Sequence, residues 1–154
     1  MYSFNTVLLP YFLLPRTLHG RMLLLMFLLL GALVSITWLM VSMLVSSILE
    51  EYIGRNALNV SKTVSLTTVV HEGLKNKNST QIQLYAESVR KATGARFVVV
   101  GDHEGRRYSH PVPERIGKLM VGGDNPRALE RGEAYVSKAV GTLGPSMRGK
   151  VPIF

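Results

Sequence analysis

Four basic side chains fall into two short clusters in the second half of the chain. Arg107 and His110 form the first cluster, and Arg148 and Lys150 form the second. Both clusters lie in segments that we expect to be β-strands, where residues two apart point to the same face. Arg148 and Lys150 therefore share a face. Cations that converge on one face of a sheet favour an anionic ligand, and a small polycarboxylate suits them best.

Charge and composition narrow the classes of partner. The 154-residue chain carries a formal net charge of +8 and contains no cysteine, which excludes disulfides, thiolate metal sites and cysteine nucleophiles. Residues 50–154 hold 16 Lys or Arg and 10 Asp or Glu residues, a net charge of +6. This charge suits nucleic acid, lipid headgroups or an anionic metabolite. Because the basic residues are spread out and aromatic residues are sparse among them, we expect no nucleic acid partner.

A long apolar segment precedes both clusters. Residues 22–48 are uncharged and rich in Leu, Met, Val and Ile, and they exceed the roughly 20 residues that a membrane-spanning helix needs. Arg16 and Arg21 precede this segment, whereas Glu50 and Glu51 follow it. By the positive-inside rule, the N-terminus lies in the cytoplasm and the segment after the helix lies outside the cell membrane.

The sequence thus predicts three parts. Residues 1–21 form a cytoplasmic segment, residues 22–48 a single transmembrane helix in contact with lipid, and residues 49–154 an extracytoplasmic domain. An alternative is a signal sequence cleaved near Ser46, although signal-sequence cores of roughly 7–15 residues are usually shorter than this one.

The sequence of the extracytoplasmic domain predicts helices followed by β-hairpins. Apolar residues recur every three or four positions in its first part, and Gly94 is placed to end the second helix. Turn residues such as Gly105 then separate short β-rich segments. The pattern predicts an α+β fold with an antiparallel sheet and flanking N-terminal helices. We expect helices over residues 50–75, 79–91 and 126–131, and strands over residues 96–100, 106–110, 134–140 and 146–154.

Three stretches, in this order and spacing, resemble a known family. VVVGDHEGRRYSHPVPERIG, VGGDNPRAL and YVSKAVGTLGPSMRGKVPI are similar to the extracytoplasmic sensor domain of the citrate and C4-dicarboxylate sensor histidine kinases, the CitA/DcuS family. The resemblance covers residues 50–154. It implies a PAS-like domain in a homodimeric bacterial membrane sensor of a two-component system, with citrate or a C4-dicarboxylate as the ligand.

The resemblance also assigns a ligand site without catalytic or metal-binding residues. It implies that Arg107 and His110 bind a carboxylate, and that Arg148 and Lys150 clamp it. Met120 lines the pocket, and Ser146 is a further contact. Thr142 and Leu143 supply a hydroxyl and backbone amides. His103 lies between two acidic residues, but on a tight turn their side chains diverge, so we expect no metal there.

The choice of ligand stays open at this point. The tract from Arg107 to Pro111 is closer to the dicarboxylate sensors, and Val99 stands where citrate sensors can carry a hydroxyl. In contrast, Arg148-Gly149-Lys150 is closer to the citrate sensors.

Members of the family continue into a last strand, a second membrane helix, a cytoplasmic PAS domain and a kinase core. The present sequence ends at Phe154, inside an expected strand, so the resemblance implies a C-terminally incomplete sensor domain. ATP, Mg²⁺ and a cytoplasmic response regulator belong only to the kinase core, and we expect no cofactor in this chain. Two alternatives remain: the sensor of a chemotaxis-type transducer, or a non-catalytic membrane-anchored interaction protein.

Overall fold

The computed structural model describes residues 17–154. Arg16 and most of the predicted cytoplasmic segment therefore lie outside the described residues. The chain divides into two compact units, Met1–Ser47 and Ile48–Phe154, and helix α1 (Leu18–Ser65) contributes to both. Each unit is considered by itself below.

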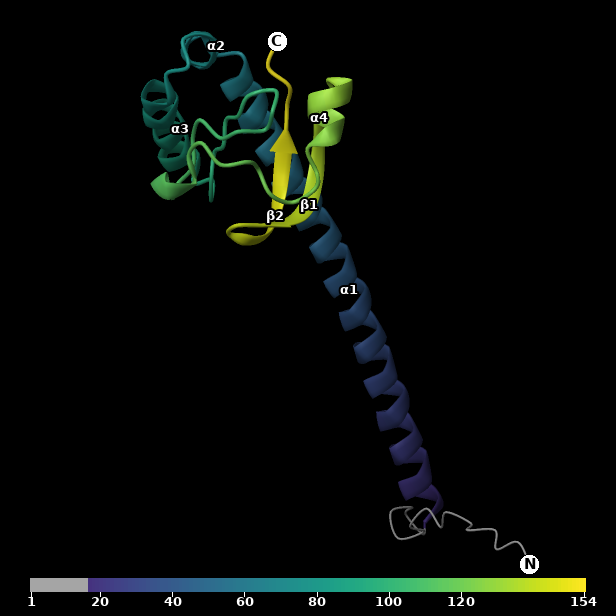
Figure 1. Ribbon diagram of the computed structural model, residues 1–154. Helices are drawn as coiled ribbons and strands as arrows, with labels where there is room; N and C mark the ends of the chain where they lie inside the picture. The colour runs from purple at the N-terminus through teal and green to yellow at the C-terminus, as the bar shows by residue number, and fades with distance from the viewer. Residues whose placement is uncertain (1–16) are drawn as a thin grey trace, which may run out of the picture. The chain divides into compact units, whose positions relative to one another are not determined.

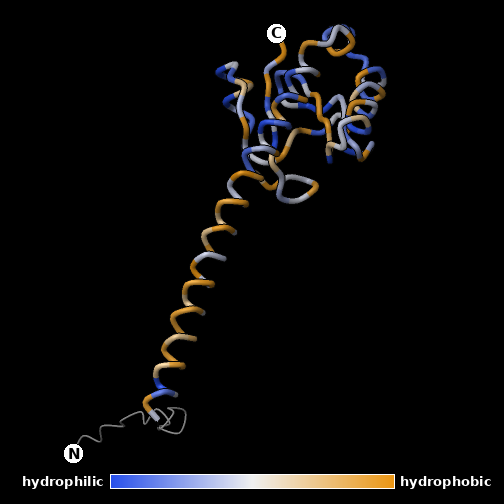
Figure 2. Tube along the Cα trace, turned by 180° about the vertical axis from the view of Figure 1, so that it is seen from behind, coloured by the Kyte–Doolittle hydropathy of each residue, from blue (hydrophilic) through white to orange (hydrophobic). Residues whose placement is uncertain are grey.

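The first unit consists, where described, of the N-terminal part of α1. Its side chains are almost all apolar and exposed (Figure 2), and the helix is long and apolar enough to cross a membrane. Two of its hydroxyl groups are bonded within the helix. The hydroxyls of Ser35 and Thr37 each donate to the carbonyl four residues earlier, at 2.8 Å. Such internal bonds are what a helix surrounded by lipid requires.

The second unit is built around a small core beneath α2 (Thr68–Lys75) and α3 (Ser79–Thr93) (Figure 1). Val64, Val70, Ile82 and Val100 are buried there. The single helix predicted over residues 50–75 is wrong in one respect, because it breaks after Ser65. Thr67 adopts an extended conformation, so that α2 changes direction and Val70 becomes fully buried.

Both ends of α3 are capped. The sequence predicted Ser79 or Thr80 as the N-terminal cap, but Asn78 takes this role and accepts a hydrogen bond from the Gln81 N–H at 3.2 Å. Gly94 ends the helix in the left-handed conformation, with φ of 67°, where a side chain would be strained.

The sheet consists of β1 (Tyr135–Gly141) and β2 (Gly144–Lys150), which pair antiparallel. The register places Ser137 opposite Arg148. Strand β2 packs directly on α1: a Cβ at Gly149 would collide with the backbone of Ala57, and the Ser61 hydroxyl donates to the Gly149 carbonyl at 2.9 Å. Antiparallel strands beside helices confirm the predicted α+β class.

The first predicted hairpin is less regular than expected. Residues 96–100 and 106–110 do not form strands, and only isolated bridges join Gly101 to Arg107 and Arg106 to Leu119. The buried side chain of Ser109 provides a reason. Its hydroxyl accepts from the Val100 N–H at 2.8 Å, so a side chain replaces a backbone partner in the ladder.

The other predicted elements differ only at their ends. Helix α4 (Pro126–Arg131) has the predicted bounds, and the short 3₁₀ helix η2 (Pro113–Arg115) was not predicted. The last strand begins at Gly144 and ends at Lys150 rather than continuing to Phe154. Pro152 has no N–H with which to extend the ladder.

Candidate functional site

A cavity of about 1150 Å³ lies in the second unit, and all eight predicted site residues line it. They come from three places: the irregular segment that follows α3, the turn between β1 and β2, and β2 itself. These residues are Arg107, His110, Met120, Thr142, Leu143, Ser146, Arg148 and Lys150.

Arg107 is the least satisfied polar group of the cavity. Its side chain is buried, with 5% of the residue exposed, and its Nη1 has no hydrogen-bond partner among residues 17–154. Burial lowers the pKa of this guanidinium, and the charges of Arg115 and Arg148 lower it further. A buried cation without a partner is costly, so this position is suited to receive an anion.

Both ring nitrogens of His110 have neighbours within hydrogen-bond distance. Nδ1 lies 3.0 Å from the Val112 nitrogen and 3.1 Å from the Val112 carbonyl oxygen, and Nε2 lies 3.3 Å from the Thr142 hydroxyl. Burial lowers the pKa of His110; the Val112 carbonyl opposes this effect, and the positive charge of Arg107 adds to it. A bound carboxylate would raise the pKa of His110, because its negative charge favours the protonated ring.

Gln83 of α3 fixes the backbone of His110. Its Oε1 accepts from the His110 N–H at 2.8 Å, and its Nε2 donates to the His110 carbonyl at 2.9 Å. The sequence analysis did not find this residue. A glutamine on an amphipathic helix carries no signal that separates it from a solvent-facing residue.

In contrast to Arg107, Arg148 has acceptors for nearly all its hydrogen-bond donors. Nη1 donates to Asp124 Oδ1 at 3.1 Å and to the Val121 carbonyl at 3.3 Å, and Nε donates to the Ser146 hydroxyl at 3.0 Å. Gly122 and Gly141 make room for the guanidinium, since a Cβ at either position would collide with it.

Lys150 is also paired within the chain. Its Nζ lies 3.4 Å from Asp124 Oδ1 and donates to Asn125 Oδ1. Burial lowers the pKa of Lys150 and Asp124 opposes the shift, although the net pKa stays below the ordinary value.

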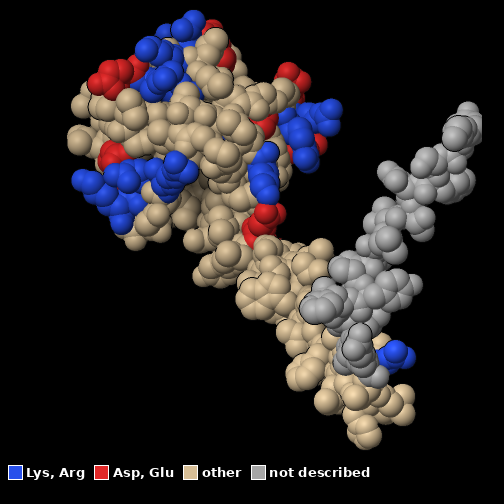
Figure 3. All heavy atoms as spheres, turned by 90° about the horizontal axis from the view of Figure 1, so that it is seen from below, with Lys and Arg blue, Asp and Glu red and all other residues tan. Residues whose placement is uncertain are grey.

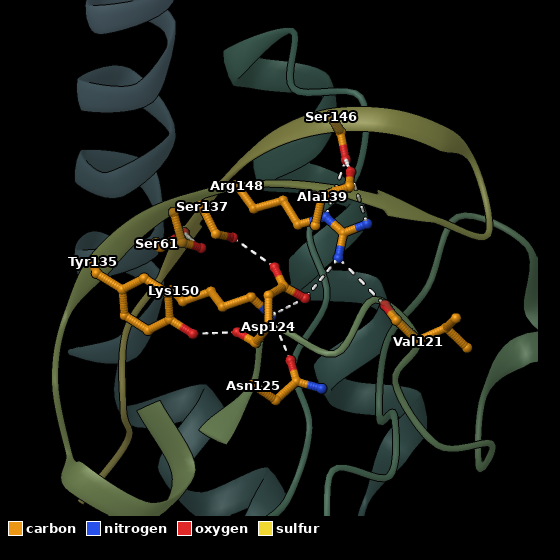
Figure 4. A network of polar contacts seen from close by, with 11 residues as sticks. Ser61, Val121, Asp124, Asn125, Tyr135, Ser137, Ala139, Ser146, Arg148 and Lys150 are labelled. Carbon is orange, nitrogen blue, oxygen red and sulfur yellow. Dashed lines mark hydrogen bonds and ion pairs between the residues drawn. The ribbon is translucent and has the colours of Figure 1, made fainter. Parts of the chain in front are cut away.

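Asp124 is therefore the centre of this cluster (Figure 4). Besides the two cations, Ser137 donates to Oδ2 at 2.5 Å, and the Tyr135 hydroxyl donates to the backbone carbonyl. Burial raises the pKa of this carboxyl, but the Ser137 hydrogen bond and the charges of Lys150 and Arg148 outweigh it, and the pKa lies below its usual range.

The sequence analysis missed Asp124. An acidic residue in the glycine-rich loop VGGDN was visible. Its partners lie 24 and 26 residues further along, however, and no local pattern connects them.

The remaining predicted residues have smaller roles in the arrangement. Met120 packs its methyl group against Gly101, and Leu143 lies in the turn. Ser146 accepts from Arg148 and lies 3.5 Å from the Ala139 carbonyl, so its hydroxyl already supports the arginine. Within residues 17–154, no three His, Asp or Glu side chains are grouped to hold a metal ion.

The basic side chains of the second unit do not form one continuous stripe in the view of Figure 3, where they lie in separate groups with acidic side chains among them. The cations that the structure does concentrate are those that line the cavity.

Comparison with known proteins identifies the family of this chain. The model of the family "single cache domain 3" matches residues 43–154. The sensor protein CitS of Halalkalibacterium halodurans is 56% identical over 107 residues, and the sensor histidine kinase CitA of Klebsiella pneumoniae is 34% identical over 123 residues. These alignments cover 69% and 77% of this chain.

The fold has a solved counterpart as well. The crystal structure of the E. coli DcuS sensor domain matches with a TM-score of 0.64 and 36% identity, over 68% of this chain and 79% of that one. The chain spans only 20% of CitS and 22% of CitA. It belongs to the single cache domain 3 family, as a sensor domain of the CitA/DcuS type.

Proposed function

We propose that residues 48–154 bind a small di- or tricarboxylate, citrate or a C4-dicarboxylate, outside the cell membrane and transmit its presence inward through α1. The observation that carries the proposal is the buried side chain of Arg107, a residue that lines a large cavity and whose Nη1 has no partner among residues 17–154. The sensing role of the family supports it.

The cavity offers two positions for carboxylate groups. At the first position, Arg107 presents a planar fork that matches a carboxylate, and His110 and Thr142 lie beside it. At the second, Arg148 and Lys150 come from the same face of β2. A ligand with carboxylates at both ends would use both positions, which a monocarboxylate cannot do.

The role of the whole protein follows the same proposal. The aligned 107 and 123 residues make up 20% and 22% of CitS and CitA, which are therefore roughly 3.5 times as long as this 154-residue chain. We infer that the domain serves as the sensor of a homodimeric two-component histidine kinase. ATP, Mg²⁺ and the response regulator would act at the kinase core, and α1 would contact lipid.

The binding test uses the full chain purified in lipid nanodiscs, titrated calorimetrically with succinate, malate and citrate. Dimethyl succinate, which lacks the charges, serves as the ligand control. Arg107→Ala should weaken binding by roughly thirty- to several-thousand-fold, because losing one partner of a buried charge pair costs about 2–5 kcal/mol. The neighbouring Arg106 provides a matched control, since it is exposed and pairs with Glu104 at 3.1 Å.

Equal affinities for the Arg106→Ala and Arg107→Ala variants, or equal binding of dimethyl succinate, would contradict the proposed site. Topology needs its own test. A reporter that is active only after export, fused after Lys75, should be active, whereas a reporter that works only in the cytoplasm should be silent there.

A further inference from the structure

The two cationic positions of the cavity differ in one respect that the proposed function does not explain. In the part of the chain that the structure describes, Nη1 of Arg107 has no partner, whereas Arg148 and Lys150 share the carboxylate of Asp124. Within residues 17–154, Asp124 is the only acidic residue in ion-pair distance of either cation. A ligand carboxylate that reaches this position meets an anion that is already there.

We propose that Asp124 is a resident carboxylate that competes with the ligand for Arg148 and Lys150, and thereby determines which carboxylates the cavity accepts. The inference rests on the proposed function and adds a specificity-determining residue to it. A carboxylate at Arg107 binds without competition, whereas each further carboxylate must displace Asp124 or lie against it.

The contacts of Asp124 are those of a ligand carboxylate. One oxygen accepts from the Arg148 guanidinium and faces the Lys150 ammonium, and the other accepts from the Ser137 hydroxyl. An arginine fork, an ammonium and a hydroxyl form the usual recognition set for a carboxylate. The side chain is also largely shielded from water, with 13% exposed, so its charge acts strongly on groups nearby.

Asp124 follows two glycines in its loop, and its side chain has few contacts besides the two cations. Gly122 and Gly123 precede it with φ values of 132° and 66°, a conformation that residues with a Cβ rarely adopt. The side-chain anchor on Oδ2 is a single hydroxyl, that of Ser137. Releasing Asp124 therefore requires breaking contacts that an incoming carboxylate can replace at the same cations.

The effect of Asp124 on affinity should depend on the charge of the ligand. Among the predicted site residues, Arg107, Arg148 and Lys150 are cations, and Asp124, which pairs with the last two, offsets one of their three charges. Repulsion from Asp124 grows with the number of carboxylates on the ligand. Removing its charge should therefore help a tricarboxylate most, a dicarboxylate less and a monocarboxylate least.

The test measures the affinities of acetate, succinate and citrate by calorimetry for the full chain in nanodiscs, in the wild type and in Asp124→Asn. Asparagine keeps the size and can still accept from Ser137. We expect affinity to rise by about tenfold or more for citrate, by less for succinate, and hardly at all for acetate. Glu104→Gln removes the same charge from an exposed side chain that pairs with Arg106 instead of the cavity cations, and it should leave all three affinities unchanged.

A second variant keeps the proposal falsifiable if Asp124→Asn folds poorly. Ser137→Ala removes the anchor on Oδ2 without changing the charge, and it should raise succinate and citrate affinity severalfold. If succinate binds the wild type but Asp124→Asn and Ser137→Ala bind it equally or more weakly, with thermal unfolding retained, Asp124 is a positioning residue and the inference is overturned. If no carboxylate binds any of these folded proteins, the proposed function itself fails.

Discussion

The two ends of the cavity hold positive charge in opposite ways. At the Arg107 end, a buried guanidinium has a donor without a partner among the described residues, and burial lowers the pKa of the neighbouring His110. At the Arg148 end, the guanidinium has three different acceptors at 3.0–3.3 Å, and a buried carboxylate balances it. The first arrangement lowers stability unless an anion arrives, whereas the second is stable without one. Two arginines of one domain thus differ in role: Arg107 is suited to binding an anion, whereas Arg148 stabilises the fold.

The largest expected effect that follows from this comparison concerns stability. Arg148→Ala should destabilise the second unit by about 3 kcal/mol, the lower end of the range for breaking a buried ion pair, because Lys150 still faces Asp124. Arg107→Ala should leave the stability of the ligand-free protein unchanged or raise it, since it removes a buried charge without a partner. Urea unfolding of the two variants measures the difference.

Equal destabilisation by both substitutions would contradict the difference proposed between Arg107 and Arg148. It would mean that Arg107 is satisfied within the folded domain. Repeating the unfolding with saturating succinate adds a second check: the ligand should stabilise the wild type and should stabilise Arg107→Ala much less.

A smaller effect sharpens the account of the Arg148 end. Gly141→Ala places a methyl group against the Arg148 guanidinium, which must then move away from its acceptors. Because the colliding atoms belong to the end of a flexible side chain, the fold should persist. Succinate affinity should fall about tenfold, the loss of roughly one charge-assisted hydrogen bond.

Val140→Ala is the matched control for Gly141→Ala, since it changes the preceding residue of β1, which is 67% exposed. Calorimetry on both variants, with circular dichroism to verify folding, provides the measurement. A normal affinity in a folded Gly141→Ala variant would show that the position of Arg148 matters little for binding.

Some residues of the cavity could be predicted from the sequence, whereas others could not. The eight predicted residues all line one cavity, and the resemblance of three motifs to a known family supplied most of them. Only the shared face of Arg148 and Lys150 follows from the local alternation of a strand. Asp124 and Gln83 escaped prediction, since their partners lie 24 to 27 residues away and depend on how the segments pack. The irregular segment around Ser109 escaped for a related reason: β-propensity predicts a strand, but a buried hydroxyl replaced part of the ladder.

The smallest expected effect concerns the protonation of His110. Burial, followed by the charge of Arg107, lowers its pKa in the ligand-free domain, despite the opposing Val112 carbonyl. A bound carboxylate favours the charged ring and raises that pKa. Binding is therefore strengthened fully below the ligand-free pKa, which lies under the ordinary value of about 6.5, and this gain is lost as pH rises through the bound pKa.

Calorimetric titration with succinate from about pH 5.5 to about pH 8 tests this sign. His110→Gln separates the histidine from the ligand, because succinate's own ionisation affects both proteins equally. The ratio of wild-type to variant affinity should fall by up to about tenfold across that range. A constant ratio would mean that His110 stays neutral in the complex and acts only as a hydrogen-bond donor. In that case Arg107 alone would supply the charge at this end of the cavity, and the contrast with the paired Arg148 would become sharper.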